Sequence, residues 1–199
     1  MQTHFDKVAK DWDMNDLKSQ LSYHIGKALL EHTTLRSNMH IMDFGAGTGL
    51  LTVHVADKVQ KVAAVDISEA MLNELMAKTH LASVKAYCQD IIRQPINEDF
   101  DGIISAMALH HVKDTDEIIK AFYGHLNDGG FIAIADLDSE DGTFHPEEMD
   151  GVFHHGFDRL VLQKKFEDAG FKDVEFRTAH TFVKEDKSEY PIFLLTAKK

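Results

Sequence analysis

The sequence predicts an α/β domain in which helices cover both faces of a mostly parallel β-sheet. Three observations favour this class. Short apolar runs alternate with stretches of helical spacing through the first two thirds of the chain, and a glycine-rich segment, Gly45–Gly49, directly follows the first run. The last two apolar runs are separated by only a short charged segment. Strands that alternate with helices are typical of a parallel sheet.

The chain up to about Arg36 is expected to be helical. Leu21, Ile25 and Leu29 recur there at the spacing of one helix face. Strands and helices alternate beyond this point. The predicted strands are Ile41–Phe44, Lys61–Val65, Val84–Cys88, Asp101–Ala106 and Phe131–Ala135, and the helices are Leu50–Ala56, about Glu69–Lys78 and a segment from near Thr115. A turn at Asn127–Gly130 is expected to lead into the fifth strand.

The C-terminal part departs from this alternation. Arg159–Ala169 has helical spacing and is followed by Gly170, a residue type typical of the position after a helix. Val174–Val183 and Ile192–Ala197 are predicted strands with only a short connection. Strands this close in sequence form hairpins, so one of the two is expected to run antiparallel. With no repeat or linker, residues 1–199 are expected to form a single domain.

The segment Gly45–Gly49, read as GAGTG, carries the clearest functional signal. Its glycines lie between a predicted strand and a predicted helix, where backbone N–H groups can approach a polar or anionic ligand. A dinucleotide fingerprint requires its third glycine three positions after the second. That position is Leu50, and an acid, Asp43, precedes the glycines. The spacing therefore disfavours NAD as the ligand.

Two acids follow the next two predicted strands. Asp66 ends the second strand, where a carboxylate can accept both hydroxyl groups of a ribose. The alternative is that Asp66 begins a turn and caps the next helix together with Ser68. Asp90 follows the third strand and is a weaker signal by itself. Together with the glycine loop, the two acids indicate a nucleoside site.

This pattern resembles the class I S-adenosylmethionine-dependent methyltransferases over nearly the whole chain. The resemblance implies a Rossmann-like, three-layer domain with a seven-stranded sheet, an antiparallel last strand and S-adenosyl-L-methionine as cofactor. The Ala-Leu-His-His stretch at 108–111 is similar to that of small-molecule enzymes related to ubiquinone and menaquinone biosynthesis. The implied cofactor-binding residues are Trp12, Asp43, Gly45, Ala46, Gly47, Gly49, Asp66, Ile67, Asp90, Ile91 and Ala106.

The resemblance also assigns roles within this site. Asp43 and the glycine loop would hold the methionine part, and Asp66 would hold the ribose. Asp90 would receive the adenine amino group, while Ile67 and Ile91 would pack on the ring. The loop after the fourth strand is expected to face the transferring methyl group, because ligands bind at the carboxyl ends of parallel strands.

Two further segments are expected to close the acceptor site. Residues 1–36 would form a helical N-terminal cap that contains Trp12, the only tryptophan. Residues 138–157, rich in phenylalanine and histidine, would form an insert suited to a planar or apolar acceptor. The alternatives are structural: Trp12 packs the leading helix on the domain, and the insert packs on the sheet edge.

The chain contains 13 histidines, several of them adjacent. His111 and His154 are the candidate catalytic bases, needed only if the acceptor loses a proton. A metal-assisted reaction is the alternative, since neutral imidazole is a common ligand. Adjacent residues usually point in different directions, and the acid-rich constellation of catechol-type enzymes is absent, so no metal is expected.

Composition narrows the class of partner. The net charge is −12, and no run rich in lysine or arginine occurs, which makes the chain a poor candidate for binding nucleic acid. The Pro-Pro-aromatic motif of amino-methylating nucleic-acid enzymes is absent too. A single cysteine, Cys88, excludes an internal disulfide framework. No apolar run reaches the roughly 18–20 residues of a membrane span, so a cytoplasmic protein is expected.

The predicted function is transfer of a methyl group from S-adenosylmethionine to a small-molecule acceptor by in-line displacement. One alternative is a non-catalytic S-adenosylmethionine-binding sensor or partner subunit, whose cofactor site would look the same. The other is a nucleotide-dependent oxidoreductase, which Leu50 and the acid before the glycines disfavour. The acceptor atom and the oligomeric state stay open.

Overall fold

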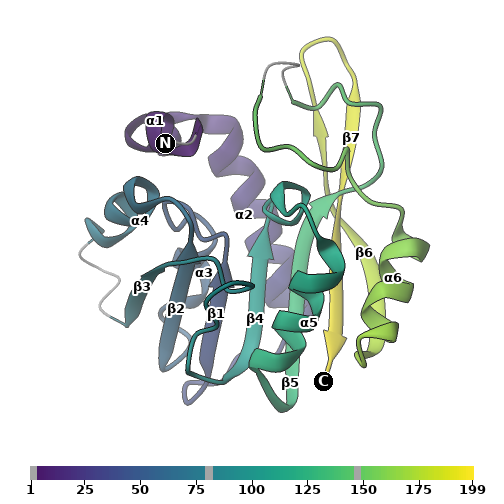
Figure 1. The fold of residues 1–199 in the computed structure, drawn as a ribbon. Coiled ribbons are helices and arrows are strands. Elements are labelled where there is room, and N and C mark those ends of the chain that lie inside the picture. Colours follow the sequence, from purple (N-terminus) through teal and green to yellow (C-terminus); the bar gives the residue numbers. More distant parts are fainter. Residues whose placement is uncertain (1–3, 79–82, 146–148) are drawn as a thin grey trace.

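The computed structural model describes residues 4–78, 83–145 and 149–199, which are organised around one seven-stranded sheet (Figure 1). The strand order is β3-β2-β1-β4-β5-β7-β6. The strands are β1 His40–Phe44, β2 Lys61–Asp66, β3 Val84–Cys88, β4 Phe100–Ala106, β5 Leu126–Leu137, β6 Lys172–Val183 and β7 Glu189–Lys198.

Strands β1 to β5 pair in parallel, whereas β7 runs antiparallel to both β5 and β6. The short connection between β6 and β7 makes them a hairpin, because a parallel pair would need a long crossover. The predicted hairpin and the antiparallel last strand are therefore confirmed.

Side-chain caps define where most of the longer helices begin. Asn15, Asp114 and Asp158 each accept hydrogen bonds from two backbone N–H groups of the following helix, and Ser68 accepts one from Met71. The helical segments are α1 His4–Val8, the 3₁₀ segment η1 Ala9–Met14, α2 Asp16–His32, α3 Thr52–Val55, α4 Glu69–Met76, η2 Leu109–His111, α5 Thr115–His125 and α6 Arg159–Asp168.

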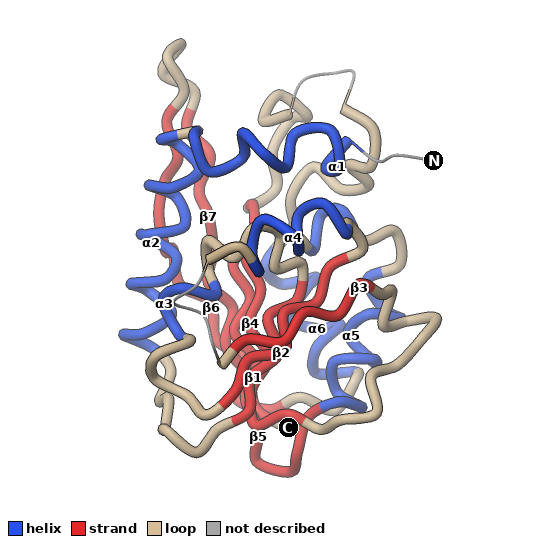
Figure 2. Tube along the Cα trace, turned by 90° about the vertical axis from the view of Figure 1, so that its left-hand side faces the viewer, coloured by secondary structure: helices blue, strands red, loops and turns tan. Residues whose placement is uncertain are grey.

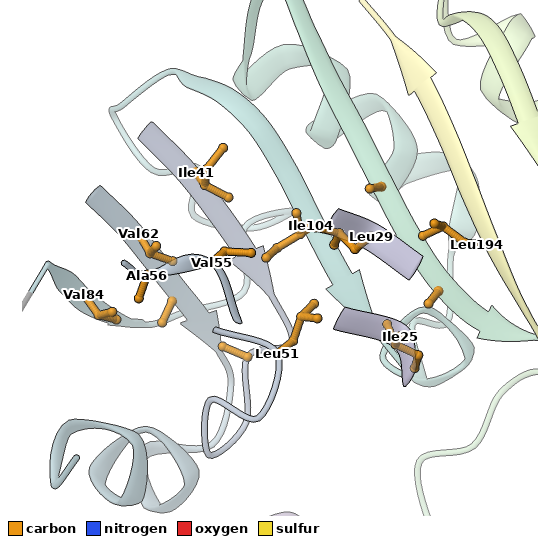
Figure 3. Packing of buried hydrophobic residues seen from close by; sticks show 14 of the residues in the cluster. Ile25, Leu29, Ile41, Leu51, Val55, Ala56, Val62, Val84, Ile104 and Leu194 are labelled. Carbon is orange, nitrogen blue, oxygen red and sulfur yellow. The ribbon is translucent and has the colours of Figure 1, made fainter. Parts of the chain in front are cut away.

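Helices cover both faces of the sheet, as predicted (Figure 2). On one face α2 and α3 bury Leu29 and Val55 against Ile104 and other strand residues (Figure 3). On the other face α5 and α6 bury Phe122 and Phe166. Each large apolar side chain removed from water contributes about 1.5–3 kcal/mol, so the two layers stabilise the sheet together.

Several boundaries differ from the sequence prediction, most of them by one to three residues. Helix α3 covers only Thr52–Val55 rather than Leu50–Ala56, and no side chain caps its first turn. The predicted turn Asn127–Gly130 lies within β5, at a point where its pairing with β4 is irregular. Strand β5 also continues beyond Ala135, because the carboxylate of Asp136 is satisfied by hydrogen bonds inside the protein.

The parallel pairing places the carboxyl ends of β1 to β5 at one edge of the sheet. The glycine loop, Asp66 and Asp90 therefore lie at the same edge as η2. Helices α1 and α4 lie above this edge (Figure 1). Among the described residues, no helix has the length and apolar character needed to cross a membrane.

Candidate active site

The glycine loop follows β1 and adopts a backbone that favours glycine. Gly45, Gly47 and Gly49 all have positive φ, at 67°, 53° and 84°. A Cβ added to Gly45 would lie 2.3 Å from the Cβ of Ala108, so this glycine also permits close packing of two loops. A Cβ added to Gly47 would have no heavy atom within 4 Å. The space above Gly47 is therefore open to a ligand.

Asp66, at the end of β2, joins the glycine loop to the start of α4. The Gly47 N–H donates to its Oδ2 and the Ser68 N–H to its Oδ1, both at 2.8 Å. Burial raises the pKa of Asp66, and these two hydrogen bonds oppose that effect. Asp66 thus begins the turn before α4, and the Ser68 hydroxyl caps this helix by accepting from the Met71 N–H. Because a carboxylate has about four acceptor sites, Asp66 retains capacity to bind ribose hydroxyls.

The predicted adenine residues separate into exposed and buried positions. Ile67 is 63% exposed beside Asp66, so its apolar side chain is accessible to a ligand. Asp90 is half-buried and accepts a 3.0 Å hydrogen bond from the Ile92 N–H. Ile91 is only 1% exposed and packs in the core. The geometry thus favours Ile67 over Ile91 as the surface that contacts a purine.

Asp43 lies beneath the loop rather than on its surface. Its carboxylate is 1% exposed and accepts a 2.5 Å hydrogen bond from the Thr52 hydroxyl. Burial raises the pKa of Asp43 to about 7, the Thr52 hydrogen bond acts against it, and the charge of Asp66 raises it further. Asp43 therefore anchors α3 to the end of β1.

Hydrogen bonds join the N-terminal segment to the glycine loop and to the turn between β2 and α4. The Thr48 hydroxyl donates to Asp13 Oδ1 at 2.5 Å, and the Lys78 ammonium lies 2.7 Å from Asp13 Oδ2. The Ser68 hydroxyl donates to Asp6 Oδ1 at 2.6 Å. These contacts hold α1 and η1 over the site from two sides.

The Phe5 ring of this segment lies toward the loop after β4. The Phe5 ring is 5.8 Å from that of Trp12 and 5.0 Å from that of His111, in edge-on arrangements. The predicted proximity of the N-terminal segment to the β4 loop is present, with Phe5 as the residue between them.

The β4 loop itself has an unusual backbone. Met107 has a φ of 55°, which side chains other than glycine rarely adopt, and its N–H donates to Ala135 O. Ala106 precedes it and Ala108 packs against Gly45. Strained positions of this kind cluster at functional sites. The short side chain of Ala108 allows this loop to lie close to the glycine loop.

His110 forms a buried pair with Asp136 of β5. Its Nδ1 lies 2.6 Å from Asp136 Oδ1, and His110 is 1% exposed. The backbone N–H groups of Leu109 and His110 donate to Asp136 Oδ2, and that of Leu137 donates to Oδ1. Burial alone would raise the pKa of Asp136, but the His110 charge and these hydrogen bonds hold it below its usual value.

Two more histidines complete a group with His110, which we call the histidine cluster (His110, His111 and His145). His145 Nε2 lies 3.0 Å from His110 Nε2, and the rings of His110 and His111 are 4.1 Å apart. His111 Nδ1 lies 2.8 Å from Gly151 O. Burial, followed by the charge of His110, lowers the pKa values of His111 and His145 to about 4.

The two histidines predicted as bases therefore differ in position. His111 belongs to the histidine cluster, whereas His154 Nε2 lies 2.9 Å from Val112 O and its ring packs near Phe157. The sequence prediction assigned no role to Asp136, and it considered His110 and His145 only among the histidines of the metal alternative. The adjacency of His110 and His111 is visible in the sequence. Their contact with His145 is not, because that residue comes from a distant segment after β5 and local periodicity does not show which segments meet. Residues 146–148 of the predicted insert lie outside the described residues.

Comparisons with known proteins agree with this arrangement. Residues 41–130 match the family described as methyltransferase domain. An uncharacterized methyltransferase of Schizosaccharomyces pombe is 30% identical over 159 residues, which cover 70% of this chain and 56% of that protein. A malonyl-[acyl-carrier protein] O-methyltransferase of Bacillus anthracis is 24% identical over 170 residues, covering 84% of this chain and 60% of that protein.

A solved structure supports the fold. A chain of the Haloferax volcanii complex that contains the Trm112 methyltransferase activator superposes with a TM-score of 0.83 at 17% identity, covering 100% of this chain and 98% of that one. The chain spans 56% and 60% of the length of the two curated relatives named above. The sheet order, the glycine loop and these matches together show that the chain belongs to the class I S-adenosylmethionine-dependent methyltransferase family.

Proposed function

We propose that the protein transfers a methyl group from S-adenosylmethionine to a small-molecule acceptor. The observation that carries this proposal is the meeting of two surfaces at one sheet edge. The open backbone at Gly47 lies beside Asp66 and exposed Ile67, and Ala108 of the β4 loop packs on Gly45. A cofactor held by the first surface would place its reactive end near the second.

The residues on the donor side fit the cofactor. Asp66 would bind the ribose hydroxyls, Ile67 would cover the adenine ring, and Asp90 would accept from the adenine amino group. Gly45, Ala46, Gly47 and Gly49 would present backbone to the methionine part, with Asp43 supporting them from below. Ala106 would line the reactive end, and Trp12 would help to cover the site.

The acceptor side would be formed by the histidine cluster and Phe5. S-adenosylmethionine supplies an electrophilic methyl group, so the protein's main task is to hold the acceptor atom in line with it. If the acceptor must lose a proton, His111 is better placed than His154 to receive it. The pKa of about 4 keeps the His111 ring neutral at pH 7, and its Nδ1 is engaged with Gly151 O, which leaves Nε2 as the basic nitrogen.

Binding and turnover test the proposal separately. Titration calorimetry should detect S-adenosylmethionine and its demethylated product but not NAD. Methyl transfer from radiolabelled cofactor to a panel of small hydroxy and carboxylic acids should then identify the acceptor class, the latter because one relative is a malonyl-[acyl-carrier protein] O-methyltransferase. Clear NAD binding without binding of either sulfur compound would overturn the proposal.

A second candidate is a non-catalytic cofactor-binding subunit. One solved chain of the same fold occurs in a complex with a methyltransferase activator, which supports a role as a subunit of a complex but not the loss of catalysis. Cofactor binding without transfer to any acceptor, alone or after addition of cell extract, would support this candidate instead.

A further inference from the structure

The histidine cluster has the geometry of a metal site, a feature that goes beyond methyl transfer and does not depend on it. His110 and His111 come from η2, and His145 comes from the segment after β5. Each ring offers one nitrogen, and these three nitrogens lie within 4.8 Å of one another. Three imidazoles meeting from two separate parts of the chain form a donor set suited to a divalent transition metal.

Hydrogen bonds fix the orientation of two of the rings. His110 Nδ1 faces the carboxylate of Asp136, and His111 Nδ1 faces the carbonyl of Gly151. Both partners can only accept, so in the neutral rings each Nδ1 carries the proton and each Nε2 presents a lone pair. The Nε2 of His110 then accepts a hydrogen bond from His145 Nε2, and binding of a metal ion requires that proton to move to His145 Nδ1. A ring N–H that donates to a carboxylate or carbonyl while the other nitrogen binds metal is the recurring arrangement around histidine ligands.

The spacing of the rings agrees with this assignment. His110 Nε2 and His145 Nε2 are 3.0 Å apart. Two nitrogens bound to one tetrahedral zinc ion at about 2.0–2.1 Å would be separated by about 3.3 Å, so a small shift admits the ion. The carboxylate of Asp136, 2.6 Å from His110 Nδ1, would offset part of the cation's charge.

We infer that His110, His111 and His145 bind one divalent transition-metal ion through their Nε2 atoms, with Asp136 as the positioning residue for His110. Three protein ligands leave a position open, as in catalytic rather than structural zinc sites. The sequence prediction of no metal rested on the divergence of adjacent residues, which does not hold for the rings of His110 and His111. In this arrangement His111 acts as a ligand, so it cannot also serve as the base.

Zinc titration of the full chain without a histidine tag tests the inference. Calorimetry at pH 7.5 should show one Zn²⁺ per chain, and Co²⁺ should give the visible absorption of a tetrahedral nitrogen site. His145→Ala should weaken Zn²⁺ binding by more than about 100-fold, because the loss of a ligand exceeds the 10–100-fold cost typical of an outer-shell change. Asp136→Asn should weaken it by about 10–100-fold, with circular dichroism used to verify that the variant is folded.

Two control variants test whether Zn²⁺ binds to histidines outside the histidine cluster. His155→Ala lies in the same segment with its side chain 63% exposed, and His180→Ala breaks a stacked pair with His24 on another surface. Both should bind Zn²⁺ within about threefold of the unchanged protein, well below the cost of a lost ligand. The absence of saturable binding, or equal losses in His145→Ala and either control, would overturn the inference. Because the measurement involves no methyl acceptor, its failure is distinguishable from failure of the proposed function.

Discussion

The carboxylate of Asp13 accepts a 2.5 Å hydrogen bond from the hydroxyl of Thr48, which ties the N-terminal segment to the glycine loop. Lys78 reinforces this contact with an ion pair to Asp13 at 2.7 Å and a hydrogen bond to Thr48 O at 2.5 Å. The N-terminal segment, the glycine loop and the residue Lys78 after α4 are thus linked by hydrogen bonds above the site. The position of the cap is therefore coupled to the conformation of the cofactor loop.

We expect Asp13→Ala to weaken S-adenosylmethionine binding by about fivefold. The partly exposed Asp13 contacts should contribute about 1 kcal/mol, and without them cofactor binding must itself order the cap. Fluorescence of Trp12, the only tryptophan, reports on the cap during titration. Asp11→Ala, an exposed acid of the same segment, should have no effect. Equal affinities for the two variants would contradict the coupling.

Gly47→Ala should abolish cofactor binding with only a small loss of stability. Both Gly47 and Gly129 have positive φ, and an added Cβ at either position meets no heavy atom within 4 Å. Alanine at each should therefore cost a similar amount, about 1–2 kcal/mol, for the left-handed backbone. Gly129→Ala, in β5, is the matched control and should bind the cofactor normally. If both variants bind alike, the space above Gly47 is not the ligand site.

Asp66→Asn should reduce S-adenosylmethionine affinity by at least about tenfold, since an amide cannot accept from both the Gly47 and Ser68 N–H groups and two ribose hydroxyls. Calorimetry measures the change. Asp57→Asn removes an exposed carboxylate whose only described partner is Lys58, and it should leave affinity unchanged. An Asp66→Asn variant with normal affinity would remove the ribose assignment.

The stability contribution of Asp43 should fall as pH rises from about 4 to about 7. Its folded pKa of about 7 lies above the ordinary value of 3.8, so the folded state holds a proton that the unfolded chain releases. A difference of about three pKa units corresponds to about 4 kcal/mol as an upper limit. The free energy of unfolding of the Asp43→Asn variant, which mimics the neutral acid, should rise relative to the unchanged protein across this window.

The histidine cluster changes the free energy of unfolding over an overlapping pH range, but its contribution rises with pH whereas that of Asp43 falls. The folded pKa values of His111 and His145 are lowered to about 4, so their contribution is present above pH 6.5 and is lost as pH falls toward 4. For this reason the Asp43 measurement compares variant and unchanged protein at each pH, because the histidine contribution cancels in the difference. A constant difference from pH 4 to pH 8 would contradict the shifted pKa of Asp43.

Much of the fold could be predicted from the sequence because it depends on local patterns. The strand at Val84–Cys88 was predicted with the bounds it has, since a short run between turn-forming residues has few alternatives. Strand β5 was predicted to end at Ala135, because Asp136 has the polarity of a loop residue. The burial of the Asp136 carboxylate depends on His110, whose position in the fold is set by packing between β4 and β5.

The sequence by itself determined the order of strands and helices and the presence of a final hairpin, because period and turn chemistry are local properties of the chain. Its resemblance to a known family, carried by the glycine spacing and the acids after the strands, added the antiparallel last strand and the class of cofactor. Only the tertiary structure decided that His145 meets His110 and that Asp13 meets Thr48, because each pair is joined by packing between distant segments. It also decided that Asp43 is buried beneath the loop, since burial depends on what α3 places over it.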